Sequence, residues 1–441
     1  MKDLFAKISL SFIFKIMSAL LAYPTAILLA RQLGSEGFGI YGFVIALVGL
    51  MIYPIVLGQD QLVVRQAALV KEHYQNLTHF PLVSFSLKFI WAISVAVSLI
   101  ITVLIIIYPT IFSIYTDTIL FGVWILPFFA VRRIYTSLLR VLDKPVLAIF
   151  PESFVQPLVI FCLLIFSLVI FEQNITPQIA IIFQLSAYAT SMVLVCVFCR
   201  NKQVNTKASQ PFAESIKKIT WVKAGFIMAL MATAEGFAMY IDRFMLGVFR
   251  PVEEVGVYLV AARNTGFVLF LESAFLLVTM PIIAKRYSKN ENISTIISIQ
   301  SMIVFIFTGA FFLLFFFLGE WIVALFGGGF ETAYLPMLIL SGAYFLGSFF
   351  GAGPHILMMT GHEKISSNIL VSTTLLNIVL NVVLITLYGV VGAALATFIS
   401  EVMKKYISYI FLKRYIENDV SVLSVNKALC VFLYNGLFRK K

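Results

Sequence analysis

Apolar stretches long enough to cross a lipid bilayer recur twelve times along this chain. A membrane-spanning helix needs about 20 apolar residues, and within hydrocarbon its backbone satisfies its own hydrogen bonds. The sequence therefore predicts an all-α membrane protein with twelve transmembrane helices. The predicted spans are residues 8–29, 39–57, 82–107, 119–139, 146–171, 179–198, 222–249, 255–283, 293–318, 333–359, 365–387 and 389–406.

The composition excludes a soluble fold. Of the 441 residues, 61% are hydrophobic and 12% are charged, which leaves too few polar groups to cover an aqueous domain. The net charge of +11 then reports orientation in the membrane, and we expect no nucleic-acid partner. The four cysteines lie in apolar or membrane-adjacent sequence without neighbouring histidines, so we predict no metal site and no disulfide.

The basic residues predict which side of the membrane each loop occupies, because short cytoplasmic loops collect lysine and arginine. Placing the amino terminus, the even-numbered loops and the tail in the cytoplasm accounts for all 32 Lys and Arg except Arg31, Arg243, Arg250 and Arg263. Lysines near span ends, such as Lys405, are counted as cytoplasmic because their long side chains snorkel to the interface. Both termini are thus predicted to be cytoplasmic.

The two halves of the chain share short patterns at similar spacing. The pattern E-x-x-G-x-Y at residues 36–41 returns 217 residues later at 253–258, and the pair at 143–144 (Asp-Lys) returns as Glu-Lys at 363–364. This predicts two six-helix lobes, 1–199 and 219–414, related by a pseudo-two-fold axis along the membrane normal. Between them lies a basic cytoplasmic linker, 200–218, and after them an amphipathic tail, 415–441, that we expect along the cytoplasmic leaflet.

One predicted span carries charges in its interior. The stretch 220–250 contains Glu235, Asp242 and Arg243, although ionisable groups in hydrocarbon cost at least a few kcal/mol and usually face a bundle interior or a water-filled path. Glu235 and Asp242 are seven residues apart, so they lie near the same helix face. We therefore expect this helix to contribute to function.

Several motifs resemble one protein family. The segment ILLARQLGSEGFGIYGFV, residues 27–44, resembles the A-R-x-L-G-x-x-x-F-G-x-Y signature of the Wzx-type O-antigen and polysaccharide flippases. These belong to the multidrug/oligosaccharidyl-lipid/polysaccharide exporter superfamily. The segment YIDRFMLG, residues 240–247, is similar to the seventh helix of that family, and Arg65 and the turn GHEK at 361–364 also fit.

This resemblance implies a flippase that works by alternating access. Members of the family move undecaprenyl-diphosphate-linked sugar units, such as O-antigen or capsule repeats, across the bacterial inner membrane. The resemblance implies no cofactor beyond a possible H⁺ or Na⁺ gradient. Its expected partners are the lipid-linked oligosaccharide, membrane lipids, a polysaccharide polymerase and a chain-length regulator.

A diphosphate head group needs positive charge along its path. Arg243, Arg263 and Lys15 are the candidate path residues, expected around a central cavity between the lobes. Two of them have a plain alternative: Lys15 and Arg243 can instead reach the membrane surface.

Three acidic residues, Glu235, Asp242 and Glu272, have two possible roles. They couple transport to an ion gradient, or they are counter-ions for Arg243 and Arg263. Protonation is favoured for Glu235 and structural pairing for Asp242.

Two other classes of function stay open. An ion-coupled multidrug exporter of the same superfamily would need acidic groups to dominate the path. A membrane enzyme of polysaccharide assembly would need a large loop domain or clustered carboxylates, which the sequence lacks. No nucleotide-binding motif is present either. We predict a transporter rather than an enzyme.

Overall fold

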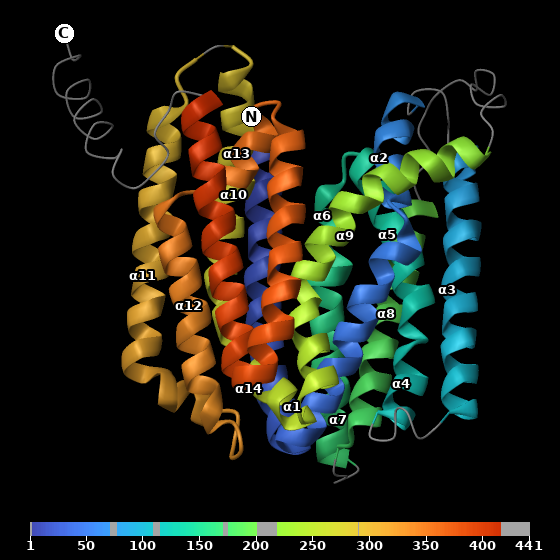
Figure 1. Ribbon diagram of the computed structural model, residues 1–441. Helices are drawn as coiled ribbons and strands as arrows, with labels where there is room; N and C mark the ends of the chain where they lie inside the picture. Colours follow the sequence, from blue (N-terminus) through green and yellow to red (C-terminus); the bar gives the residue numbers. More distant parts are fainter. Residues whose placement is uncertain are drawn as a thin grey trace. The chain divides into compact units, whose positions relative to one another are not determined.

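All regular structure in the described part of the chain is helical (Figure 1). This computed structural model describes residues 2–70, 77–108, 115–170, 175–200, 218–289 and 291–415. Within them the predicted all-α class is confirmed, and eight helical segments are long and apolar enough to cross a membrane. The protein is therefore a multi-pass membrane protein, while the number of crossings and the side of the termini stay predictions.

The chain divides into two compact units, Met1–Phe244 and Met245–Lys441, which we call the N-terminal and the C-terminal unit. The predicted linker lies almost wholly outside the described residues, and so does the predicted tail apart from its first residue. The predicted lobe boundaries therefore stay predictions.

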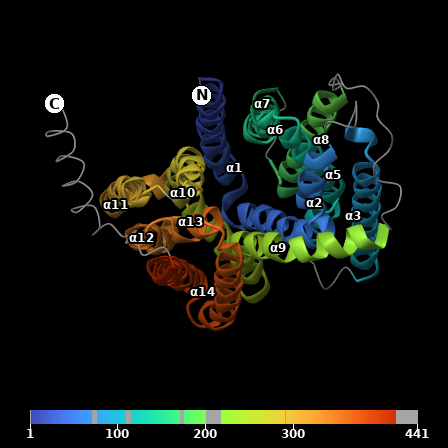
Figure 2. The same ribbon diagram turned by 90° about the horizontal axis from the view of Figure 1, so that it is seen from above.

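The N-terminal unit is organised around α5. This helix packs against α1, α2, α3 and α8, and Figure 2 shows it lying among α2, α3 and α8. The elements are α1 (Lys2–Val56), α2 (Gln59–Val70), η2 (Leu77–His79), α3 (Pro81–Ile107), α4 (Thr116–Gly122), α5 (Ile125–Val141), α6 (Pro145–Phe150), η3 (Pro151–Val155), α7 (Gln156–Ile170), α8 (Pro177–Arg200) and α9 (Lys218–Phe249), whose last five residues pass into the other unit.

The C-terminal unit has α12 at its centre, packed against α10, α11 and α14 (Figure 2). Its elements are α10 (Val252–Tyr287), α11 (Ser294–Ala324), η4 (Glu331–Ala333), α12 (Tyr334–Phe349), α13 (Gly353–Met359) and α14 (Glu363–Tyr415).

Two of the long helices are each a pair of arms joined at a glycine. Gly34 in α1 has φ 66°, and Gly389 in α14 has φ 56°, values that residues with a Cβ rarely adopt. The predicted spans 8–29 and 39–57 fall on either side of Gly34, and the span 365–387 ends just before Gly389. In both α1 and α14, two neighbouring predicted spans thus correspond to the two arms of one helix.

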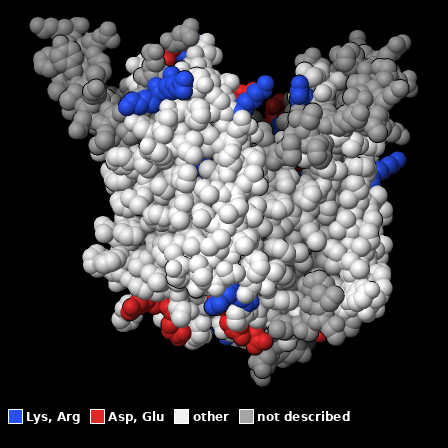
Figure 3. All heavy atoms as spheres, viewed as in Figure 1, with Lys and Arg blue, Asp and Glu red and all other residues white. Residues whose placement is uncertain are grey.

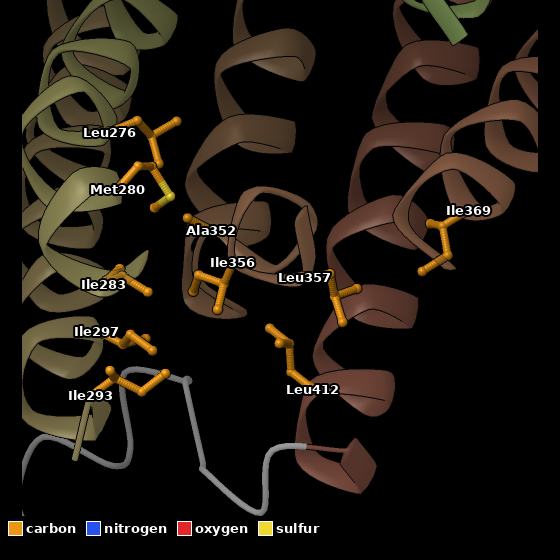
Figure 4. Close-up of a cluster of buried hydrophobic side chains, with 10 residues drawn as sticks. All are labelled: Leu276, Met280, Ile283, Ile293, Ile297, Ala352, Ile356, Leu357, Ile369 and Leu412. Carbon is orange, nitrogen blue, oxygen red and sulfur yellow. The ribbon is translucent and has the colours of Figure 1, made fainter. Parts of the chain in front are cut away.

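A hydrophobic cluster joins four helices where α10 ends (Figure 4). Ile283, Ile356 and Leu357 are fully buried in it. Burying such a side chain contributes about 1.5–3 kcal/mol. The cluster therefore fixes α10, α11, α13 and α14 against one another. Its members are Leu276, Met280, Ile283, Ile293, Ile297, Ala352, Ile356, Leu357, Ile369 and Leu412.

Charges gather at opposite ends of the C-terminal unit. Over this unit, Figure 3 shows Lys and Arg at the end where α10 and α14 finish, and Asp and Glu at the other end. The basic residues of the last helical turns are Lys285, Arg286, Lys413 and Arg414, and the first turn of α10 holds Glu253 and Glu254. Figure 3 also shows Lys and Arg atoms at the acidic end, where Arg250 pairs with Glu254. Apart from this residue, the separation by end is the pattern that the positive-inside rule uses.

Replacing Gly389 with alanine is expected to destabilise the C-terminal unit by about 1–3 kcal/mol, the usual cost of a strained backbone position. A Cβ at this position would lie 2.3 Å from Glu254 Oε2, the oxygen that accepts a 2.8 Å hydrogen bond from the Val390 amide. Thermal unfolding in detergent micelles measures the effect. Gly266→Ala in α10 is the matched control, because nothing lies within 4 Å of its added Cβ. Equal melting temperatures for the two variants would contradict the prediction.

Candidate functional site

Two adjacent arginines of α5 lie inside the N-terminal unit. Each meets a carboxylate from a different element: Arg132 meets Glu152 of η3, and Arg133 meets Asp60 of α2. Buried charges need such partners, because an isolated charge in an apolar interior is very unfavourable. The two ion pairs join α5 to η3 and to α2 inside this unit.

Arg133 and Asp60 form a closed pair. Both Nε and Nη2 of Arg133 donate to Asp60 Oδ2, at 3.1 and 2.7 Å. The two side chains are 22% and 10% exposed. The guanidinium also lies 4.8 Å from the ring centroid of Tyr53, a cation–π contact.

Arg132 and Glu152 form a more open pair. Arg132 Nη1 lies 2.9 Å from Glu152 Oε2, yet Nε and Nη1 have no hydrogen-bond partner within the described residues, so this contact is close in distance but poorly aligned. The arginine side chain is 2% exposed, whereas that of Glu152 is 54% exposed. Phe129 and Tyr188 cover the guanidinium at 5.1 and 5.5 Å.

Tyrosines connect this charged region with α9. A Cβ added to Gly236 of α9 would lie only 2.1 Å from the Tyr53 ring of α1. A Cβ added to Gly49 of α1 would lie only 2.7 Å from the Tyr240 ring of α9. Both glycines are thus required for the close approach of α1 and α9. The Arg243 guanidinium lies 5.9 Å from the Tyr240 ring centroid.

The structure places the predicted residues of α9 as follows. Arg243 is half-buried, Asp242 is buried and Glu235 is exposed. Arg243 is therefore close to the tyrosine-lined part of the N-terminal unit through Tyr240. Lys15 lies on α1, and its side chain is outside the described residues.

In the C-terminal unit the predicted acid Glu272 meets a cation from another helix. Lys405, on the second arm of α14, donates a hydrogen bond to Glu272 Oε1. The expectation that Lys405 snorkels to the surface is wrong, because this residue is 8% exposed and its stem packs against Gly347 of α12. Arg263, one of the two arginines proposed as a partner for the acids, is an exposed residue of α10.

The structure gives Arg132 and Arg133 contacts that the charge count from the sequence does not predict. That count assigns both to the cytoplasmic side, which stays a prediction. The structure buries Arg132 within α5 and pairs both residues with carboxylates. The signal was present, since both arginines lie within the predicted span 119–139 and Glu152 within 146–171. Charges inside an apolar span are functional candidates by default.

Comparison with known protein families shows the family to which this chain belongs. The model of the polysaccharide biosynthesis protein family matches residues 4–287. The chain belongs to this family. The predicted resemblance to polysaccharide flippases is therefore confirmed at the level of the family.

One curated relative is the probable low-salt glycan biosynthesis flippase Agl15 of Haloferax volcanii. It is 31% identical over 169 residues, which are 37% of this chain and 35% of the relative. The match thus spans about a third of the length of Agl15.

Solved transporter structures share the fold of this polysaccharide biosynthesis protein. The lipid II flippase MurJ in an inward closed conformation has a TM-score of 0.71 and 14% identity, covering 96% of this chain and 92% of MurJ. An inward-facing multidrug resistance MATE family transporter of the MOP superfamily has a TM-score of 0.69 and 12% identity, covering 93% and 98%. These relatives are described as flippases and transporters, in agreement with the expectation that the chain is not an enzyme.

Proposed function

We propose that this protein is a flippase that moves a lipid-linked oligosaccharide across the membrane by alternating access. Family membership and the shared fold of flippases and exporters support the proposal. The observation that carries it is the pair of arginines in α5, set among tyrosines within a unit of apolar helices.

The chemistry of the substrate explains this arrangement. A sugar diphosphate on a lipid has a polar, anionic head that hydrocarbon excludes, so it needs a hydrated path with hydrogen-bond donors and positive charge. Guanidinium groups bind phosphate oxygens through two parallel N–H bonds, and tyrosines offer an apolar ring beside a polar hydroxyl. The N-terminal unit supplies both kinds of group.

The finer points belong to the same proposal. The substrate is an undecaprenyl-diphosphate-linked O-antigen or capsule repeat, and the membrane is a bacterial inner membrane crossed twelve times with both termini in the cytoplasm. The predicted path cations are Arg243, Arg263 and Lys15. The predicted coupling or counter-ion residues are Glu235, Asp242 and Glu272. A polysaccharide polymerase and a chain-length regulator act on the product.

The leaflet position of the lipid-linked sugar tests the function. In cells that lack the protein we expect accumulation in the inner leaflet, relieved by the wild type and not by Arg263→Ala at an equal protein level. Arg286→Ala is the matched control, since this exposed residue at the end of α10 makes one ion pair among the described residues, a 3.8 Å contact with Glu291. Arrival of the sugar-lipid in the outer leaflet without the protein, and without a compensating flippase, would exclude the proposal.

Ion coupling is tested at Glu235. This exposed acid of α9 is the proposed protonation site. We expect Glu235→Gln to transport equally well with and without a pH gradient, and more slowly than the wild type when the gradient is present. If Glu235→Gln matches the wild type under both conditions, H⁺ coupling does not run through this residue.

A second candidate is an ion-coupled multidrug exporter. The TM-score of 0.69 to a MATE family transporter is nearly as high as that to MurJ, so the fold alone accommodates this function. Drug accumulation in the same cells separates the two candidates. A flippase leaves drug efflux unchanged on deletion, whereas an exporter leaves the sugar-lipid distribution unchanged.

A further inference from the structure

The two adjacent ion pairs of α5 differ in a way that a purely structural role does not require. Arg133 makes two hydrogen bonds to a carboxylate that is 10% exposed. Arg132 is more deeply buried, yet its Nε and Nη1 have no hydrogen-bond partner in the described part of the chain. A buried guanidinium left partly unsatisfied is a costly arrangement, so its persistence needs a reason.

The missing partner of Arg132 has a definite chemistry. A guanidinium presents five N–H donors in a planar fork and no acceptor, and this fork matches the oxygens of a carboxylate or phosphate. The Glu152 carboxylate lies 2.9 Å from Arg132 Nη1, but Nε and Nη1 of this guanidinium still have no hydrogen-bond partner among the described residues. Among the described residues, Gln156 Nε2, one helical turn after Glu152, and the Thr136 hydroxyl, one turn after Arg132, also have no hydrogen-bond partner. The guanidinium and amide groups are donors, and the hydroxyl can donate as well, which favours an oxyanion ligand.

Glu152 is the exposed side chain that lies beside the buried Arg132 guanidinium. The carboxylate is 54% exposed although it lies within the predicted apolar span 146–171. A charged group there is disfavoured in lipid and favoured beside a water-filled path. If Glu152 swings away, the space it leaves opens on the buried guanidinium. Glu152 also lies on η3 (Pro151–Val155), a π-helical turn, and such turns interrupt the regular helical hydrogen bonding and are frequent at functional sites.

We propose that Arg132 is an oxyanion-binding residue and that Glu152 is its exchangeable counter-ion, which a phosphate group of the ligand displaces. Arg133 is the positioning neighbour: its Nε and Nη2 both donate to Asp60, which joins α5 to α2, whereas Nε of Arg132 has no hydrogen-bond partner among the described residues. The expected ligand group is a phosphate oxyanion, and this identification rests on the proposed function. Its sources are the diphosphate of a lipid-linked sugar or the head group of an anionic phospholipid.

The exchange predicts a particular response to Glu152→Gln. Without the carboxylate the buried guanidinium loses its counter-ion, so the purified full-length variant is expected to unfold at a lower temperature than the wild type. Added inorganic pyrophosphate takes the vacated place and restores the melting temperature, because a ligand that binds only the folded state stabilises it by mass action. We expect the apparent Kd for pyrophosphate to be at least about tenfold lower than in the wild type, about 1.4 kcal/mol.

Two further variants make the result specific. Arg132→Gln in the Glu152→Gln background should abolish the response to pyrophosphate, since the fork is gone. Asp60→Asn, which weakens the neighbouring closed pair, should lower the melting temperature without any tightening of pyrophosphate binding. An unchanged Kd in a folded Glu152→Gln variant, or equal tightening in Asp60→Asn, overturns the proposal.

The source of the phosphate is separated in lipid nanodiscs. Pyrophosphate binding is measured in neutral-lipid nanodiscs with added polyprenyl diphosphate or phosphatidylglycerol. If polyprenyl diphosphate competes and phosphatidylglycerol does not, the site binds the lipid-linked substrate. Competition by phosphatidylglycerol assigns it to the surrounding lipid and overturns the substrate assignment. The leaflet experiment is independent of these assays, so a failed leaflet test with intact pyrophosphate binding rejects the flippase and keeps the site.

Discussion

Replacing Lys405 with methionine is expected to lower the free energy of unfolding by about 3–5 kcal/mol, the usual cost of leaving one partner of a buried ion pair uncompensated. Lys405 is 8% exposed and donates to Glu272, whose side chain is 14% exposed. The methionine keeps the length of the lysine stem, so the loss comes from the charge. The measurement is SDS-driven unfolding of the purified protein in mixed micelles.

Lys404→Met is the matched control at the neighbouring position. Lys404 pairs with Glu401 three residues away on the same helix, and both side chains are about twice as exposed, 20% and 22%. Partly exposed pairs of this kind contribute about 0–1 kcal/mol. We expect this variant to lose less than a third of what Lys405→Met loses.

The double variant Glu272→Gln/Lys405→Met separates the charge from the packing. It should recover most of the lost stability, because no uncompensated charge is then left in the interior. A double variant as unstable as Lys405→Met would mean that the lysine stem against Gly347 carries the stability, and that the ion pair contributes little.

The fold was predictable because apolar length is a local property. A span of about 20 apolar residues leaves few alternatives to a transmembrane helix, and the described helices overlap the predicted ranges. Three predicted spans are divided between elements: 119–139 between α4 and α5, 146–171 among α6, η3 and α7, and 333–359 between α12 and α13. The glycine-linked arms of α1 and α14 also fit, since Gly34 and Gly389 lie between predicted spans or at the edge of one.

The candidate site was predictable only in part, because ion pairs join residues far apart in the chain. Arg133 and Asp60 are 73 residues apart, and Lys405 and Glu272 are 133 apart. A sequence shows that such charges exist inside apolar helices but not which of them meet. The sequence places Lys405 near the end of a predicted span, which suggests that its long side chain reaches the surface. In the folded protein the side chain instead points inward and meets Glu272.

The same limit explains why Arg132 and Arg133 were absent from the predicted path residues. Their position next to a loop that is predicted to be cytoplasmic resembles the usual excess of basic residues in such loops. Two observations in the sequence argue otherwise: both arginines lie before the end of an apolar span, and the next span contains Glu152. Weighing charges by depth in the span, rather than by the nearest loop, would have selected them.

Replacing Asp60 with alanine is expected to reduce the amount of folded protein and transport together. Asp60 is the acceptor of both described hydrogen bonds from Arg133, and its loss leaves a mostly buried guanidinium without its carboxylate, at a cost of about 3–5 kcal/mol. Stabilities of folded domains are themselves only about 5–15 kcal/mol, so most of the margin disappears. Folded protein is measured by size-exclusion chromatography in detergent, and transport by the leaflet position of the sugar-lipid.

The second-site change Arg133→Gln tests the role assigned to this pair. If Arg133 does not contact the substrate, then Asp60→Ala/Arg133→Gln recovers the folded protein, because no uncompensated charge is left in the interior. It then also recovers transport per folded molecule, because the Arg132 guanidinium is unchanged. If Arg133 itself binds the substrate, the double variant folds but does not transport. The comparison therefore distinguishes the positioning arginine from the binding one, two neighbours on α5 that differ chiefly in the exposure and alignment of their carboxylate partners.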